Sequence, residues 1–423
     1  MENWETLVAL FGFMVLTGFV AGSYPAIILS GFKPVTTLKG SLKLSGSNFF
    51  TKTLVALQFA LSVMLIISTL VMKNQLQFIR SQDLGYNTEH VVYIPLNQLD
   101  GLKIANDFRT TIGGHTDIVD ITATGVAVGF KGSYGYGVEY NGESININVF
   151  TVESNYIDFM EMELVAGRNF SPDLATDTTE SVIITETFAR EFGLTDPIGK
   201  QVPALTPGKD DHGGAIIVGV VKDHYFQSLY DEMDPAFLTM NPAWGHGNLL
   251  IRIRPENMQE TIAMIKDTWN IFVPEIPLNY RFLNEDMYSK YADDERWTTI
   301  VNYSSLFAIF IACLGLFGLV TLTISSRIKE VGIRKVLGAS VLQISGLFAK
   351  DFVKLVTIGV LIASPIAWYA MNEWLMNFAY HISIGPIHFI LATVIVLIIA
   401  LTTISFQTIK AGFTNPVETL SNE

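Results

Sequence analysis

Five long apolar runs dominate the pattern of hydrophobic and polar residues along the chain. Each supplies about 20 helical residues, enough to cross a bilayer core of about 30 Å. One run contains Pro365 but carries no charge after Lys354. The pattern predicts an α-helical membrane protein with five transmembrane helices, at residues 6–30, 53–72, 301–325, 352–371 and 387–409.

The segment between the second and third runs follows a different pattern. It opens with "HVVYIPL", "GLKIANDFRTTIGG" and "DIVDITATG", which predict a strand, a helix and a strand. It closes in the same order with "NLLIRIR", a helix from Pro255 and "PLNYRFL". Two β-α-β units framing residues 126–247, which are rich in short alternating stretches, predict a large α+β domain, ferredoxin-like in outline, with a mostly β subdomain inserted.

The closing helix of this segment has a regular apolar face. Its large apolar residues are spaced four, three, four and three apart, at Met258, Ile262, Ile265, Trp269 and Phe272. This spacing places them in one stripe of an amphipathic helix. The stripe is expected to pack on a sheet.

The distribution of charged residues also separates residues 76–298 from the rest of the chain. Residues 76–298 hold 15 Lys and Arg against 33 Asp and Glu, whereas the remainder holds 12 against 7. Basic residues outside that block gather in two short connections: Lys33, Lys39, Lys43 and Lys52, and Arg327, Lys329, Arg334, Lys335, Lys350 and Lys354. The positive-inside rule makes both connections cytoplasmic. Residues 76–298, the 373–386 turn and the N-terminus are therefore predicted to be extracytoplasmic.

A single cysteine excludes a disulfide framework. Cys313 lies inside a predicted span, so the external domain, residues 76–298, must be stabilised by its own core. The first run is not a secretory signal, because it is too long and carries Glu2 and Glu5 where basic residues belong.

The stretch "SRIKEVGIRKVLGAS", residues 326–340, predicts a short surface helix between two spans. Glu330 and Arg334 are four residues apart in the order that favours an ion pair. Gly338 can end the helix, and Ser340 with Gln343 predicts a capping box for the next one. The simpler interpretation is a basic loop at the membrane surface that only follows the orientation rule.

This stretch resembles the cytoplasmic coupling segment of MacB and FtsX type permeases of ABC transporters, which docks on a separate ATPase. Glu330, Gly332, Arg334, Gly338 and Ala339 match that segment. Further likeness lies in "KTLVALQFALSVMLIIS", "LGYNTEHVVYIPL", "VGVVKDHYFQSLYDEMDPAFL" and "RFLNEDMYSKYADDERW". The resemblance implies ATPase-coupling residues at Arg327, Glu330, Gly332, Ile333, Arg334, Lys335, Leu337, Gly338 and Ala339.

A short repeat suggests where this copy begins within such a permease. Pro-Val-x-Thr-Leu occurs at residues 34–38 and again at 416–420, each after a span, and a five-residue match can also arise by chance. Permeases of this type have four or eight spans, so five suggest an N-terminally shortened copy of the eight-span kind. Secondary cytoplasmic contacts are expected at Lys33, Pro34, Val35, Pro416 and Val417.

The resulting domain plan has five parts. Residues 1–31 resemble the last span of a missing preceding half, and 32–52 form a cytoplasmic connection. Residues 53–75 form the next span, 76–298 a MacB-like periplasmic domain, and 299–423 an FtsX-like permease domain with three spans.

Catalytic sites find little support in the sequence. The stretch "GLTDPIGKQ", Gly193–Gln201, has five residues between its glycines where a phosphate-binding loop has four, and Gln201 replaces the Ser or Thr that binds magnesium. Asp210, Asp211 and His212 or Asp223 and His224 lack a metal-site spacing. No catalytic residue, metal or directly bound cofactor is expected, and ATP with Mg²⁺ is assigned to a partner.

The resemblance implies a permease subunit of an ABC transporter that exports or extracts a substrate, in the bacterial cytoplasmic (inner) membrane. Its expected partners are a cytoplasmic ABC ATPase, a second permease half or a homodimer, and membrane lipid, with no nucleic acid. An FtsX-like activator of a cell-wall hydrolase, a membrane-anchored receptor or sensor, and a membrane enzyme remain alternatives. A receptor needs a cytoplasmic signalling domain, and the predicted cytoplasmic segments are far shorter than a domain.

Overall fold

A computed structural model describes most of the chain, and the chain divides into two compact units. One unit comprises residues 1–59, 312–358 and 400–423, and the other comprises 60–311 and 359–399. The described residues are 4, 8, 11–19, 22–23, 47–97, 99–126, 134–140, 143–202, 214–226, 229–285, 291–327, 330, 332–334 and 337–412.

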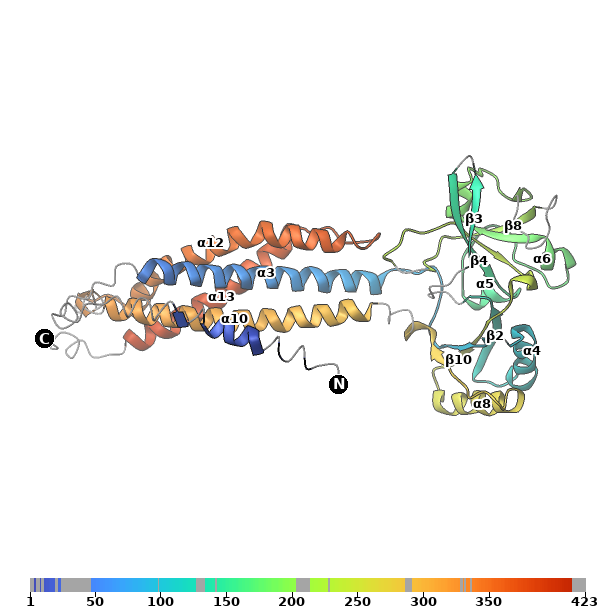
Figure 1. Ribbon diagram of the computed structural model, residues 1–423, viewed down its shortest axis with the longest axis horizontal. Helices are drawn as coiled ribbons and strands as arrows, with labels where there is room; N and C mark the ends of the chain where they lie inside the picture. The colour runs from blue at the N-terminus through green and yellow to red at the C-terminus, as the bar shows by residue number, and fades with distance from the viewer. Residues whose placement is uncertain are drawn as a thin grey trace. The chain divides into compact units, whose positions relative to one another are not determined.

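Four helices of the described residues are long and apolar enough to cross a membrane. They are α3 (Ser47–Ser81), α10 (Ala292–Ser326), α12 (Val341–Leu375) and α13 (Pro386–Gly412), and they are the long helices of Figure 1. They confirm four of the predicted spans. Of the predicted span at 6–30, residues 11–19 and 22–23 are described, and these are helical.

Two of these helices extend beyond their apolar runs. α3 continues through polar residues to Ser81, and α10 begins at Ala292, nine residues before the apolar run that starts at Val301. A helix of 35 residues is about 52 Å long at 1.5 Å per residue. These extensions place regular helix on either side of the external domain in the sequence.

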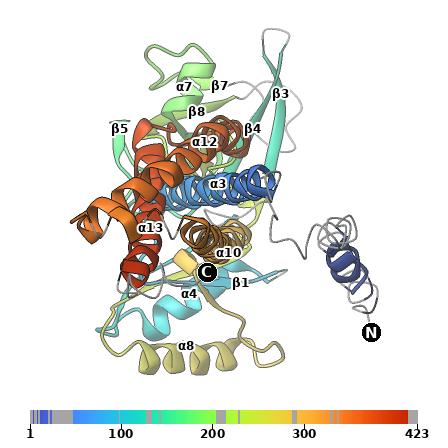
Figure 2. The same cartoon turned by 90° about the vertical axis from the view of Figure 1, so that its left-hand side faces the viewer.

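The framing part of the external domain is a four-stranded antiparallel sheet. Its strands are β1 (Val91–Pro95), β2 (Ile118–Thr124), β10 (Asn248–Ile253) and β11 (Arg281–Phe282), in the order β11-β1-β10-β2. Helices α4 (Gly101–Ile112) and α8 (Met258–Phe272) lie on the same side of these strands (Figure 2). The order and the two β-α-β units confirm the ferredoxin-like prediction.

Two local predictions in this sheet are wrong. The helix begins at Met258, with Asn257 as its left-handed cap at φ 60°, so Pro255 precedes the helix instead of occupying its first turn. The stretch Pro277–Leu283 pairs only at Arg281 and Phe282. Four residues of the predicted stripe are nevertheless correct, because Ile265 and Trp269 are buried and Met258 and Ile262 pack on the same core, whereas Phe272 is exposed.

The insert subdomain, residues 126–247, is mostly β, as predicted. Its strands follow the order β3-β4-β9-β6-β8-β5, with β7 also paired to β8. The strands are β3 (Tyr134–Tyr140), β4 (Glu143–Thr151), β5 (Leu164–Gly167), β6 (Ser181–Thr185), β7 (Gln201–Val202), β8 (Ala215–Val221) and β9 (Ala236–Thr239). Short helices connect them: α5 (Tyr156–Phe159), α6 (Ala175–Thr179), α7 (Glu186–Glu191) and η1 (Pro242–Trp244).

The two subdomains share a hydrophobic core. One face of the framing sheet packs on α4 and α8 through residues such as Val92, Ile121 and Ile251. The opposite face contributes Tyr93 and Leu250 to a cluster that also contains residues of the insert, including Phe150, Val152 and Tyr156. Burial of both faces makes the external domain one packed body.

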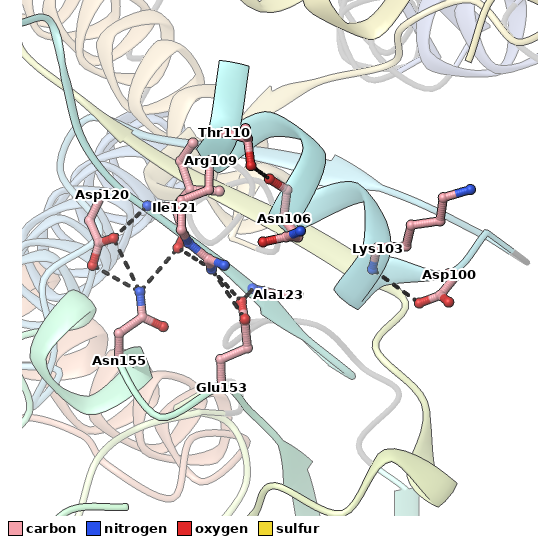
Figure 3. Close-up of polar contacts among 10 residues, drawn as sticks. All are labelled: Asp100, Lys103, Asn106, Arg109, Thr110, Asp120, Ile121, Ala123, Glu153 and Asn155. Atoms are coloured by element: carbon pink, nitrogen blue, oxygen red, sulfur yellow. Dashed lines mark hydrogen bonds and ion pairs between the residues drawn. The ribbon is translucent and has the colours of Figure 1, made fainter. Parts of the chain in front are cut away.

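A polar network joins the subdomains beside this core (Figure 3). Arg109 of α4 donates to the carboxylate of Glu153, which follows β4, at 3.0 and 3.1 Å. Arg109 also donates to the Ile121 carbonyl at 3.0 Å, and Glu153 accepts from the Ala123 amide at 2.6 Å. Asn155 donates to Asp120 at 3.0 and 3.1 Å. Each subdomain therefore satisfies polar groups of the other.

Arg252 forms a second polar link from the framing sheet. Its guanidinium donates to the carbonyls of Phe159, Glu89 and Asn87, and lies 5.1 Å from the centre of the Phe159 ring. A largely buried charge is tolerated only with such partners. Arg252 therefore holds α5 of the insert against the start of β1.

We predict that Glu153→Gln lowers the stability of the external domain by about 1–2 kcal/mol, because Arg109 and the Ala123 amide lose a charged acceptor. Urea unfolding of the full chain in detergent, followed by near-ultraviolet circular dichroism, measures the change. Lys103→Gln removes an exposed charge from α4, the helix that carries Arg109, and is expected to have little effect on the stability of the domain. Equal unfolding free energies of the two variants would contradict the predicted contribution of this network to stability.

His224 is a buried titratable group of the insert subdomain. Its side chain is 1% exposed and lies among the rings of Tyr86, Phe150 and Phe226. Burial disfavours the imidazolium and lowers the pKa of His224 from 6.5 to about 4.

Acidification should therefore destabilise the external domain. The unfolded chain binds a proton at His224 below about pH 6.5 whereas the folded chain does not until about pH 4, so stability present above pH 6.5 is lost as the pH falls through this window. We expect a loss on the order of 1–2 kcal/mol between pH 7 and pH 5. Urea unfolding at both pH values tests this, and His224→Phe should flatten the dependence. An unchanged pH dependence in that variant would contradict the prediction.

Candidate coupling site

The coupling segment, residues 327–340, joins the end of α10 to the start of α12. It is helical at residues 330 and 332–334 and turns at 337–338. The predicted coupling residues Arg327, Glu330, Gly332, Ile333, Arg334, Leu337, Gly338 and Ala339 are therefore placed together between two long helices. The predicted contacts Lys33, Pro34, Val35, Lys335, Pro416 and Val417 lie outside the described residues.

The predicted ion pair within this segment is present. Arg334 Nη2 lies 2.8 Å from Glu330 Oε1, and each side chain is about two-fifths exposed. An exposed pair of this kind contributes only about 0.3–0.5 kcal/mol to a helix. Its main effect is to hold both charged groups in a defined orientation at the surface.

The end of the segment is a sharp, capped turn. Gly338 has φ 90°, and the Ala339 amide donates to the Arg334 carbonyl at 2.9 Å, the long bond of a Schellman motif. The Ser340 amide donates to Gln343 Oε1 at 3.0 Å, and Ser340 Oγ accepts from the Gln343 amide at 3.3 Å. This reciprocal pair confirms the predicted capping box and fixes where α12 begins.

One face of the segment is apolar and exposed. Ile333 and Leu337 are 54% and 80% exposed and are four residues apart, so they lie side by side on a helical turn. Gly332 is buried, and Arg327 lies 4.0 Å from Asp351 of α12. The segment therefore presents two large apolar side chains together with an ordered charge pair.

Polar contacts join the helices within the unit that contains this segment. Gln407 of α13 donates to Thr321 of α10 at 3.0 Å, and Ser345 of α12 donates to Thr408 of α13 at 2.7 Å. Gly315 of α10 leaves room for the side-chain amide of Gln58 of α3, which lies where a Cβ would stand. The helices on both sides of the segment are thus bound to a common neighbour, α13.

Sequence reasoning missed Gln75, a fully buried polar residue of α3. Its amide nitrogen donates to the Tyr380 carbonyl at 3.0 Å, and its oxygen accepts from the Ile382 amide at 2.9 Å. The local sequence gave no signal, because the partners are about 300 residues away.

Asp223 and His224, the sequence candidates for metal binding that the structure describes, do not belong to a cluster of metal ligands. Asp223 accepts hydrogen bonds from the Thr187 amide and hydroxyl at 2.7 Å, and His224 is enclosed by aromatic rings. Asp210, Asp211 and His212 lie outside the described residues. Across the part of the chain that the structure describes, no group of three potential metal ligands comes together.

A polar groove of about 600 Å³ lies where the chain passes from α3 to β1. Its charged lining residues are Asp83, Glu89, Glu161, Glu163 and Lys222. Lys222 Nζ lies 2.8 Å from Glu163, and Arg252 lies 3.9 Å from Glu161. The groove is acidic, and part of its charge is neutralised by these pairs.

Family models match two regions of the chain. The MacB-like periplasmic core domain matches residues 54–268, about half of the chain, and the FtsX-like permease C-terminal domain matches residues 302–416. The coupling segment lies inside the second match, and most of the external domain lies inside the first. Proteins of this kind are multi-pass proteins of the bacterial inner membrane with a periplasmic domain.

Curated relatives have modest identity. The macrolide export ATP-binding/permease protein MacB of Neisseria gonorrhoeae is 23% identical over 278 residues, covering 60% of this chain and 40% of the relative. The protein of the same name from Neisseria meningitidis is 23% identical over 274 residues, covering 59% and 40%. The chain thus spans about two-fifths of the length of these relatives.

Solved structures give weak matches. The periplasmic region of MacB from Actinobacillus actinomycetemcomitans has a TM-score of 0.36 at 14% identity and covers 51% of this chain and 98% of that one. A domain of a putative permease from Porphyromonas gingivalis has a TM-score of 0.34 at 17% identity, with 46% and 89% coverage. The family assignment therefore rests on the sequence models: the chain belongs to the MacB/FtsX-type permeases of ABC transporters.

Proposed function

We propose that this permease receives ATP-driven motion from a separate cytoplasmic ATPase at the coupling segment and transmits it to the periplasmic domain. The observation that carries the proposal is the exposed face of Ile333 and Leu337 on a segment capped at Ser340 and bound to α12. Large apolar side chains exposed side by side and rimmed by polar residues mark a protein interaction surface. The Glu330–Arg334 pair supplies a polar rim for that interface.

The rigid ends of the segment make it suitable for transmitting force. α10 ends at Ser326 and α12 begins at Val341, so movement of the segment displaces two long helices directly. A partner drives such movement only if it binds one arrangement of the helices more tightly than the other. ATP binding and hydrolysis on the partner would supply that difference.

We place ATP and Mg²⁺ on the partner and not on this chain. Gly193 and Gly199 have φ of 61° and 80° and each forms a separate turn, with Lys200 donating from its amide to the Pro197 carbonyl. A phosphate-binding loop instead needs consecutive amides aimed at one anion. The stretch Gly193–Gln201 therefore supports a structural role.

The proposed function also includes transport of a substrate and assembly with a second permease half. The curated relatives are named for macrolide export. We propose export or extraction of a substrate through movement of the periplasmic domain, in an assembly with a second permease half or a second copy of this chain, surrounded by lipid. Such an assembly would have two-fold or pseudo-two-fold symmetry.

We expect Ile333→Ala and Leu337→Ala each to reduce ATPase capture by about tenfold, because truncating an apolar interface anchor costs about 1–2 kcal/mol. The measurement is the amount of ATPase subunit that co-purifies with the detergent-solubilised permease, and the ATP hydrolysis of the complex. Leu322→Ala is a matched control, since Leu322 is similarly exposed at 66% but lies within α10. Unchanged capture in both coupling variants would contradict the proposal.

A further inference from the structure

Four residues of the periplasmic part form what we call the clasp: Leu229 and Tyr230 of the insert subdomain, and Ala379 and Tyr380 of the turn between α12 and α13. The Ala379 amide donates to the Tyr230 carbonyl at 3.2 Å, and the Tyr380 amide donates to the Leu229 carbonyl at 3.4 Å. All four residues belong to the same compact unit. The turn is therefore bound to the insert subdomain through its backbone.

Aromatic packing reinforces the clasp. The Tyr230 ring stacks on Phe378 with centroids 4.6 Å apart, and Tyr225 meets Tyr380 edge to face at 5.0 Å. Trp374, near the end of α12, lies 5.0 Å from Phe378. Leu229 and Phe378 are each 2% exposed, so this contact excludes water. Aromatic pairs in such geometry add about 0.5–1.5 kcal/mol each beyond their buried area.

The start of α10 holds the same two insert residues. The Leu229 amide donates to the Tyr291 hydroxyl at 2.9 Å, and the Tyr230 hydroxyl donates to Asp294. Tyr291 and Leu229 are also buried in one hydrophobic cluster with Leu76 and Ile79 of α3. Leu229 and Tyr230 are thus held from α10 as well as from the turn after α12.

Gln75 positions the turn for this contact. Its amide group binds the Tyr380 carbonyl and the Ile382 amide, so it satisfies the backbone on both sides of His381. One residue earlier, Asn74 lies 3.0 Å from His388 at the start of α13. α3 therefore fixes the turn in the position from which Ala379 and Tyr380 reach the insert.

The covalent connections of the periplasmic domain do not include this turn. The chain enters the domain from α3 into β1 and leaves it from β11 into α10, so both covalent links join the framing sheet. α12 and α13 reach the domain only by non-covalent contacts, and the described backbone contacts are those of the clasp. The covalent connection of α12 to the domain therefore runs only through the coupling segment and α10.

We infer that the clasp is the route by which α12 drives the insert subdomain, with Gln75 as its positioning residue. This inference rests on the proposed function. α10 and α12 are the two helices on either side of the coupling segment. Residues at the start of α10 contact Leu229 and Tyr230. Residues just after the end of α12 contact the same two residues. The rival route runs only through the covalent links into the framing sheet and predicts that the clasp is dispensable for coupling.

Two variants break the clasp from opposite sides. Tyr230→Ala removes the stacked ring and the hydroxyl from the insert, whereas Ala379→Pro removes the amide donor from the turn and changes no residue of the periplasmic domain. Arg296→Ala is the matched control, because Arg296 lies on the same helix as Asp294 and, among the described residues, forms an exposed pair with Asp293. Both clasp variants should expose the Tyr380 amide to about tenfold faster hydrogen exchange, which corresponds to about 1.4 kcal/mol.

The test compares hydrogen exchange of the full permease with its co-purified ATPase, without nucleotide and with ATP plus vanadate. In the unchanged protein and in Arg296→Ala, we expect nucleotide to alter exchange at residues 376–382, in β9 and around Leu229. In the two clasp variants, the change at 376–382 should persist while the change in the insert falls by about tenfold, the equivalent of about 1.4 kcal/mol of lost coupling.

The outcomes separate the two proposals. A full nucleotide response in the insert of both clasp variants would overturn the inference and leave the proposed function intact. No nucleotide response anywhere in the unchanged complex would overturn the proposed function and the inference together. Loss of the response in Ala379→Pro with normal exchange across the rest of the insert would support the clasp and exclude misfolding.

Discussion

Unbroken helices on both sides of the coupling segment are the feature on which the rest of the structure depends. A bilayer core offers no partners for free backbone groups, so crossing segments remain helical throughout. α10 and α12 are each 35 residues long, and one turn capped by Gly338 and Ser340 separates the coupling helix from α12. Under the proposed function, a displacement at the segment would therefore move both helices.

The periplasmic domain is packed as one body. The framing sheet buries one face against its own helices and the other against the insert, while Arg109, Glu153 and Arg252 satisfy polar groups across the boundary. Buried and well-paired groups of this kind resist local rearrangement more than the exposed pair Glu330–Arg334 does. The buried contacts that hold elements together are therefore concentrated in the periplasmic domain.

Local sequence patterns predicted much of this architecture, because the relevant signals lie within a few residues of one another. Four of the five predicted spans, the ferredoxin-like framing units and the capping box at Ser340 all follow from periodicity and spacing. Pro255 and the last strand were misplaced, because the left-handed cap at Asn257 and the short pairing of β11 are set by tertiary contacts. Gln75 and the clasp were not predictable, since they join residues about 150 to 300 positions apart.

The central claim is that input at the coupling segment and output at the periplasmic domain lie on opposite sides of the membrane. Labelling of intact cells with a membrane-impermeant maleimide tests it most directly, using Leu337→Cys and Ile271→Cys in a Cys313→Ser background, since both positions are highly exposed. We expect Ile271→Cys to react on intact cells and Leu337→Cys to react only after permeabilisation. Labelling of Leu337→Cys on intact cells, or protection of Ile271→Cys, would contradict the claim.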